Sequence, residues 1–258
     1  MTKSWALFKK LSWPRFVLMN WVVAFELLML VISGLWQAIR GDFHAYTPFF
    51  TLCGFMMIPL VVSLVMLAVK NERTTMTETY RLIPISDWKL YLLNLGASLA
   101  NQIYLWLVQG ILFGITLLIG HNSLEKVFNG VPEGLGQLNS EVNLVQFGLT
   151  AIVVGILSLL LIWSTISLVH FVTNAASSFL PRFRQNVVNV IIYIIVMAIA
   201  IRLVSALIGG LSFLSSQAIN GGVIDNMWVG IAVMVLVTLI EGALNVWILS
   251  KWVEPKLD

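Results

Sequence analysis

Six long apolar runs, separated by more polar segments, dominate the pattern along this chain. They lie at residues 16–36, 48–69, 90–119, 144–171, 187–207 and 227–249. A helix needs about 20 mostly apolar residues to cross roughly 30 Å of hydrocarbon, and each run reaches that length. The runs are apolar at odd and even positions alike, whereas strands of a membrane barrel alternate. The pattern therefore predicts an all-α, polytopic membrane protein with six transmembrane helices in a single transmembrane domain, residues 1–258.

Composition excludes the main alternatives. The chain is 59% hydrophobic and 10% charged, whereas soluble domains are about 45–50% apolar and about 25% charged. A soluble enzyme is excluded because the polar residues are too few to cover a globule. Disorder is excluded because the chain has so much apolar surface to bury. The single cysteine, Cys53, cannot form an internal disulfide.

The distribution of Lys and Arg predicts the orientation of the helices. Twelve of the 15 basic residues fall before the first run, between the second and third, between the fourth and fifth, or after the sixth. Cytoplasmic segments carry the excess of Lys and Arg, so we expect these segments and both termini in the cytoplasm. The net charge of +3 is then a consequence of topology and does not indicate nucleic-acid binding.

The segment 3–13 precedes the first run and is followed by Pro14, which stops or kinks a helix. On a helical wheel its lysines, among them Lys9 and Lys10, fall on one half, and apolar residues such as Trp5 fall on the other. We expect an interfacial amphipathic helix at residues 3–13, with its lysines toward anionic lipid headgroups. A disordered basic leader is the alternative.

The segment 70–89 joins the second and third runs and contains apolar residues among its charges. A plain connection needs only a few turn residues, so this length and composition predict a folded element. Thr77 or Thr79 is suited to cap a short helix that Pro84 ends, and Ser86 or Asp87 is suited to cap the next span. The apolar side chains face either a partner protein or the helices of the chain itself.

Three ionisable residues lie within the apolar runs: Glu26, Arg202 and Glu241. Charged groups inside a membrane are costly, so they usually face one another or a water-filled path. Glu26 and Arg202 are expected to form a pair. The three residues either line a translocation path or tie helices together structurally.

Two glycines four residues apart, Gly110 and Gly114, lie in the third run. Small residues at this spacing allow two membrane helices to approach closely. We expect a helix-packing face here, either within the bundle or against a second copy of the chain.

Known catalytic and metal-binding motifs are missing from the sequence. It has no G-x-x-x-x-G-K-[ST] loop and no H-E-x-x-H, and its three histidines are far apart. We therefore expect no enzymatic activity of this chain alone, no cofactor and no metal. Two rival classes stay open: an intramembrane hydrolase that uses Glu26, Glu241 and His170, and a non-transporting immunity or scaffold protein that sequesters a peptide.

Six spans with both ends inside, a basic amphipathic leader and a folded second loop together resemble the membrane-spanning permease subunits of type-2 ABC exporters. Residues 77–89, with Leu82 and the run Pro84-Ile85-Ser86, are similar to the stretch that forms the coupling helix of these subunits. The resemblance is to small permeases of Gram-positive bacteria, and it implies a bacterial plasma membrane.

The resemblance implies a complex of two six-helix subunits, identical or paralogous, with two separate cytoplasmic ATPase chains that bind ATP and Mg. Each ATPase would hold the coupling segment, residues 70–89, in a surface groove. Closure of the ATPase pair would then tilt the helices and switch access between the two membrane faces. The cargo would be a peptide, a drug or another amphipathic compound. The residues expected to contact the ATPase are Thr79, Tyr80, Leu82, Ile83, Pro84, Ile85 and Trp88.

Overall fold

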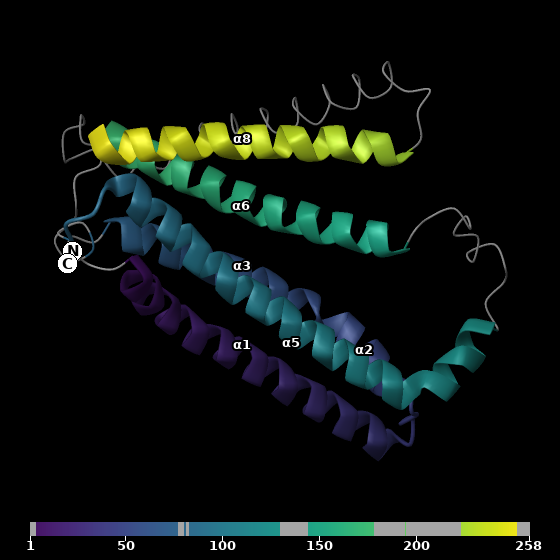
Figure 1. Cartoon of the computed structure of the whole chain (residues 1–258). Coiled ribbons are helices and arrows are strands. Elements are labelled where there is room, and N and C mark those ends of the chain that lie inside the picture. Colours follow the sequence, from purple (N-terminus) through teal and green to yellow (C-terminus); the bar gives the residue numbers. More distant parts are fainter. Residues whose placement is uncertain are drawn as a thin grey trace. The chain divides into compact units, whose positions relative to one another are not determined.

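The structure, a computed structural model, describes residues 4–76, 80, 83–129, 144–177, 194 and 223–251. Their helices are shown in Figure 1 and are α1 (Ser4–Arg40), α2 (Thr47–Phe55), α3 (Met57–Met76), α5 (Asp87–Asn129), α6 (Leu144–Ser177) and α8 (Val223–Lys251). No strand occurs in these ranges. The predicted all-α class is confirmed for this part of the chain.

Five helices of the described part are long and apolar enough to cross a membrane. They are Ser4–Arg40, Thr47–Met76, Asp87–His121, Gly148–Ala175 and Gly230–Lys251. Each contains most of one predicted span. The remaining predicted span, 187–207, which contains Arg202, lies outside the described residues apart from Ile194, as does the segment 208–222.

Apolar and polar side chains are distributed in the way expected for a protein in lipid. Large apolar residues such as Trp21 and Leu118 are exposed, at 73% and 76%. Amide side chains such as Asn101 and Gln102 are buried between helices. Lipid solvates apolar side chains, while polar groups need partners on neighbouring helices. This distribution, together with five long apolar helices, indicates a multi-pass membrane protein.

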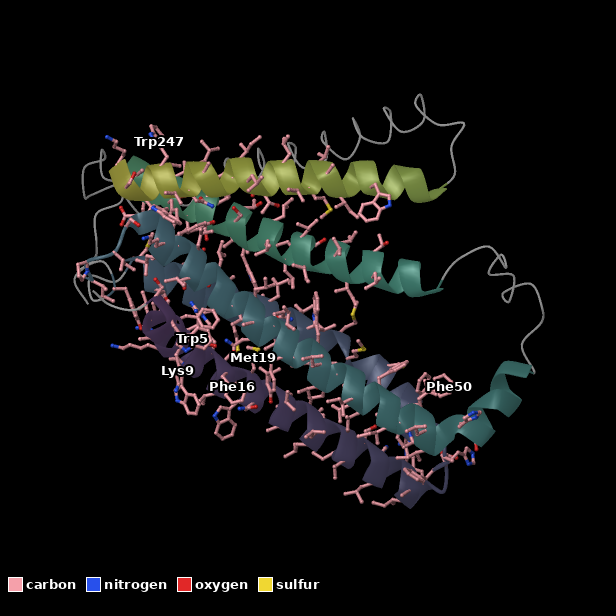
Figure 2. The ribbon with its side chains drawn as sticks, in the orientation of Figure 1. Trp5, Lys9, Phe16, Met19, Phe50 and Trp247 are labelled. Atoms are coloured by element: carbon pink, nitrogen blue, oxygen red, sulfur yellow. The ribbon has the colours of Figure 1, made fainter. Side chains whose placement is uncertain are left out.

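Helix α1 runs without a break through Pro14, so the predicted end of a separate interfacial helix at this residue is not observed. Proline removes one backbone donor, but membrane helices tolerate it when other groups supply hydrogen bonds. The carbonyl group that lacks its backbone donor because of Pro14 is that of Lys10, four residues earlier. A separate side-chain hydrogen bond lies next to it, from Arg15 Nη1 to the carbonyl oxygen of Leu11 at 3.3 Å. Trp5 and Lys9 lie exposed on the first turns of α1 (Figure 2).

The second predicted span, 48–69, forms two helices that meet at Met56. The physical reason lies in Pro59, which has no N–H to donate to the carbonyl group of Phe55, four residues earlier. The chain turns only slightly there, because Met56 keeps helical angles and its N–H donates to the Leu52 carbonyl oxygen at 2.8 Å.

Helix α5 begins where the sequence predicts a cap. Ser86 precedes its first residue, Asp87, and the Ser86 carbonyl oxygen accepts from the N–H groups of Lys89 and Leu90 at 2.9 and 3.1 Å. The other end differs from the prediction, because α5 continues to Asn129, past the expected boundary at residue 119. Helix α5 is therefore longer than its apolar run, because the more polar residues after 120 are helical as well.

The chain divides into two compact units. Unit 1 comprises Met1–Ser4, Ala68–Leu95 and Gly148–Asp258, and unit 2 comprises Trp5–Leu67 and Gly96–Phe147. In unit 1, α6 and α8 run in the same direction (Figure 1). In unit 2, contacts between α1 and α5 advance together along both helices, from Ser12 with Asn101 to Glu26 with Gln109. The first and third spans are therefore parallel, as expected.

Candidate functional site

A buried polar cluster of Tyr91, Ser164 and Asn245 joins α5, α6 and α8 within unit 1. Asn245 is fully buried, and its Nδ2 donates to Tyr91 Oη at 2.9 Å and to the Ser164 carbonyl oxygen at 2.8 Å. Ser164 Oγ lies 3.1 Å from the same nitrogen and 3.4 Å from Tyr91 Oη. Hydrogen bonds between membrane helices fix which faces meet, so this cluster, the unit 1 polar cluster, sets the register of three helices.

Hydrogen bonds at two further places join helices of unit 1. Asn94 of α5 donates its Nδ2 to the backbone carbonyl oxygen of Asn71 of α3 at 2.9 Å. Thr165 of α6 donates its hydroxyl to Glu241 of α8, with the two carboxyl oxygens at 2.9 and 3.1 Å. Glu241, which the sequence singles out inside the sixth span, thus lies one helical turn from Asn245 and has a partner on α6. The contacts together include all four described helices of unit 1.

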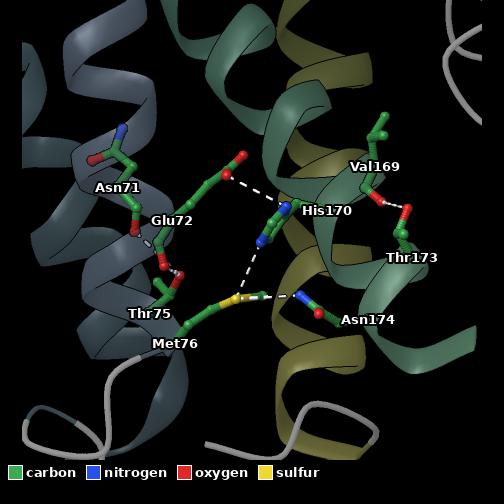
Figure 3. A network of polar contacts seen from close by, with 8 residues as sticks. All are labelled: Asn71, Glu72, Thr75, Met76, Val169, His170, Thr173 and Asn174. Atoms are coloured by element: carbon green, nitrogen blue, oxygen red, sulfur yellow. Dashed lines mark hydrogen bonds and ion pairs between the residues drawn. The ribbon is translucent and has the colours of Figure 1, made fainter. Parts of the chain in front are cut away.

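A second polar group links the last turn of α3 to the end of α6 (Figure 3). His170 Nδ1 lies 3.4 Å from Glu72 Oε2, and His170 Nε2 lies 3.2 Å from the sulfur atom of Met76. Asn174 donates its Nδ2 to the same sulfur at 3.2 Å. The group therefore attaches the end of α3, which forms the first part of the coupling segment, to α6.

The coupling segment is described in part. Tyr80, Ile83 and Ile85 are half-buried, Pro84 is exposed, and Trp88 is 50% exposed on the first turn of α5. The Nζ atom of Lys89 lies 5.3 Å from the centre of the Trp88 ring. Two of the predicted ATPase contacts, Thr79 and Leu82, lie outside the described residues. Among the described members of the set, Pro84 and Trp88 are therefore exposed, whereas Tyr80, Ile83 and Ile85 are half-buried.

Glu26 lies in unit 2 and is 3% exposed. Gln109 of α5 donates its Nε2 to Glu26 Oε2, while Oε1 has no hydrogen-bond partner among the residues that the structure describes. The predicted partner, Arg202, lies outside those residues, so the Glu26–Arg202 pairing stays a prediction. Glu26 also borders a cavity of about 480 Å³ between α1 and the α2–α3 region.

Gly110 and Gly114 have no close neighbour in the described structure. A Cβ atom added at either glycine meets nothing within 4 Å. No described residue packs against this face, so both parts of the prediction, packing within the bundle and contact with a second copy, stay predictions.

The alternative hydrolase function would use Glu26, Glu241 and His170, and these residues are distributed over both units. The described ranges contain no group of three His, Cys, Asp or Glu residues placed to hold a metal ion. His170 and Glu241 belong to unit 1, whereas Glu26 belongs to unit 2. The observed partners of these three side chains are amides, hydroxyls, a thioether and Glu72.

Compared with protein-family models, with curated proteins and with solved structures, this chain has no match. Sequence reasoning missed Tyr91, Ser164 and Asn245. One signal was present, because Asn245 follows Glu241 by four residues and so shares its helix face, where buried polar groups of neighbouring helices meet.

Proposed function

We propose that this chain is the transmembrane subunit of an ATP-driven exporter of the type-2 ABC class, moved by separate ATPase chains that grip residues 70–89. The observation that carries the proposal is the arrangement of unit 1. Helices α3 and α5, which enter and leave the coupling segment, are joined to each other by the hydrogen bond from Asn94 to the Asn71 carbonyl oxygen. Buried hydrogen bonds of Asn245 join α5 to α6 and α8, and the partly buried Glu72–His170 contact joins α3 to α6. A force on the segment would therefore act on four helices together.

The physical basis is mechanical. Packed helices held by hydrogen bonds move as rigid elements, and transporters switch access by rocking one group of helices against another. Residues 68–95 cluster with 148–258 and not with the other helices of the chain. Unit 1 is thus the part that moves first when the segment is pushed. The cargo expected from the apolar, membrane-embedded surroundings is an amphipathic compound such as a peptide or a drug.

The test is photo-crosslinking of the full chain in its native membrane. A crosslinking amino acid at Trp88, which is half exposed, is expected to capture a protein that carries a G-x-x-x-x-G-K-[ST] loop and hydrolyses ATP in the purified complex. The matched control is the same substitution at Trp228, which is 55% exposed on α8, and it should capture no such protein.

A second variant checks that the contact is apolar. Leu82→Asp should prevent co-purification of the ATPase while the chain still inserts into the membrane, because a buried carboxylate in the ATPase groove is costly. Wild-type yield of the ATPase with this variant, together with no ATPase crosslinked from Trp88, would overturn the proposal.

A further inference from the structure

A cavity of about 480 Å³ lies within unit 2. One wall is formed by α1 residues from Pro14 to Met29, and the other by residues from Phe55 to Met66 of α2 and α3. Its size falls within the range of small-molecule sites, about 300–1,000 Å³. All of the lining side chains are apolar or aromatic except Glu26. The cavity is therefore apolar, with one acidic group at its border.

The acidic group is incompletely hydrogen-bonded within the part of the chain that the structure describes. Glu26 is only 3% exposed. Its Oε2 atom accepts a hydrogen bond from Gln109 Nε2. Oε1 is buried without a hydrogen-bond partner among the residues that the structure describes. A buried carboxyl oxygen without a donor costs free energy, which a donor on a bound molecule would recover. Rotation about the last side-chain torsion, which is broad in Glu, presents either oxygen to the cavity.

The cavity is also reachable from the surroundings of the helices. Trp21 and Phe25, which line it from α1, are 73% and 61% exposed, and Ile58 on α3 is 49% exposed. In a membrane protein such exposed apolar side chains face hydrocarbon. A ligand that partitions into lipid can therefore arrive through the bilayer, with its apolar part already desolvated.

We propose that this cavity binds small lipophilic amines, with the apolar body among Trp21, Phe25 and Ile58 and the ammonium group on Glu26. Two requirements of the site select this class. The apolar walls favour a hydrocarbon or aryl body, and the incompletely paired carboxyl group favours a cationic donor, since charge-assisted hydrogen bonds are about twice as strong as neutral ones. That the amine is the exported cargo rests on the proposed function, whereas its binding does not.

The test uses the purified full chain in lipid nanodiscs and two probes of the same shape. Tritiated 4-phenylbutylamine carries an ammonium group where its isostere pentylbenzene carries a methyl group. We expect saturable binding of the amine and competition by unlabelled amine at least about tenfold stronger than by pentylbenzene. Glu26→Gln should weaken amine binding about ten- to hundredfold and leave pentylbenzene binding unchanged.

Two control variants keep the result interpretable. Glu241→Gln removes a half-buried acid on α8 of unit 1, which does not line the cavity, and it should change amine binding less than twofold. Val22→Trp fills the cavity while it leaves Glu26 in place, so it should abolish binding of both probes. Melting curves of each variant establish that the chain stays folded.

The outcomes separate the inference from the proposed function. Equal amine binding by folded Glu26→Gln and wild type, equal competition by the two probes, or full amine binding by Val22→Trp would overturn the amine site and leave the exporter proposal untouched. Amine binding that depends on Glu26, in a chain that recruits no ATPase, would keep the site and reject the exporter.

Discussion

Asn245 on α8 donates a hydrogen bond to Tyr91 on α5 at 2.9 Å, across 154 positions of the sequence. Both side chains are buried, and both contact Ser164 of α6. The contact matters for the proposed mechanism because Tyr91 lies in the first two turns of α5, directly after the coupling segment. In the proposed mechanism, movement of that segment would reach α8 through the hydrogen bond from Asn245 to Tyr91.

Replacement of Asn245 by leucine should reduce both stability and coupling. Asn245→Leu removes the donor to Tyr91 and Ser164 and leaves their acceptors buried. Single hydrogen bonds between membrane helices contribute on average about 0.6 kcal/mol and up to about 1.7 kcal/mol, so a loss of about 1 kcal/mol of unfolding free energy is expected. Reversible unfolding in mixed detergent micelles measures this loss.

Trp247→Leu is the matched control for Asn245→Leu. Trp247 lies two residues away on α8 and is 55% exposed, so its replacement should change the unfolding free energy by less than about 0.5 kcal/mol. Equal stability of Asn245→Leu and wild type would mean that the unit 1 polar cluster does not hold the helices together.

Glu72 and His170 should behave as a coupled pair. Their 3.4 Å contact joins α3 to α6, so the effects of Glu72→Gln and His170→Asn on unfolding should not add. Residues in direct contact show interaction energies of about 0.5–3 kcal/mol in double-mutant cycles. A control cycle that combines Glu72→Gln with Thr238→Ala should be additive, because Thr238 donates to Met234 in its own helix. Additive effects in the first cycle would show that the pair contributes nothing.

Hydrophobic pattern alone identified the helices in the described part of the chain, because a span needs length and apolar character and little else. The start of α5 was predictable too, since Ser86 and Asp87 suit a helix N-terminus. The local rule for proline was a weaker guide. Pro14 lies within α1, and Pro59 divides α2 from α3 without ending the span, because membrane helices offer other partners for freed backbone groups.

Which helix faces meet was not predictable from the sequence. The donor observed for Glu26 is Gln109 of α5, which the depth of residues in the membrane did not identify, and the pairing of Glu26 with Arg202 stays a prediction. Depth orders residues along the membrane normal and says nothing about the angle around each helix axis. The same limit hid the unit 1 polar cluster, whose three members come from three separate spans.

Gly110 should tolerate a large side chain, unlike Gly96. Nothing lies within 4 Å of a Cβ atom added at Gly110, whereas one added at Gly96 meets the Phe8 ring at 3.8 Å. Gly110→Leu should therefore leave the melting temperature of the chain unchanged or higher. Gly96→Leu should lower the unfolding free energy relative to Gly110→Leu, because the added Cβ atom is already in ordinary contact with the Phe8 ring and the rest of the leucine side chain must displace that ring. A clear loss of stability in Gly110→Leu would mean that a second copy or an undescribed segment packs on this face.

The position of the coupling segment relative to the membrane decides whether an ATPase can reach it. In a Cys53→Ala background, Ser86→Cys and Asp42→Cys place one thiol before α5 and one between α1 and α2, both at exposed positions. Removal of Cys53 is needed because that thiol is itself exposed. The excess of Lys and Arg around residues 70–89 predicts that an impermeant maleimide labels Asp42→Cys in intact cells and labels Ser86→Cys only after the membrane is opened.

The paired design makes a failed reaction distinguishable from a wrong topology. Both thiols should react fully in detergent, which shows that each is chemically accessible. Labelling of Ser86→Cys in intact cells, with protection of Asp42→Cys, would place the coupling segment outside the cell. A cytoplasmic ATPase could not then grip it, and the exporter proposal would fail, while the amine site of unit 2 would still be open to its own binding test.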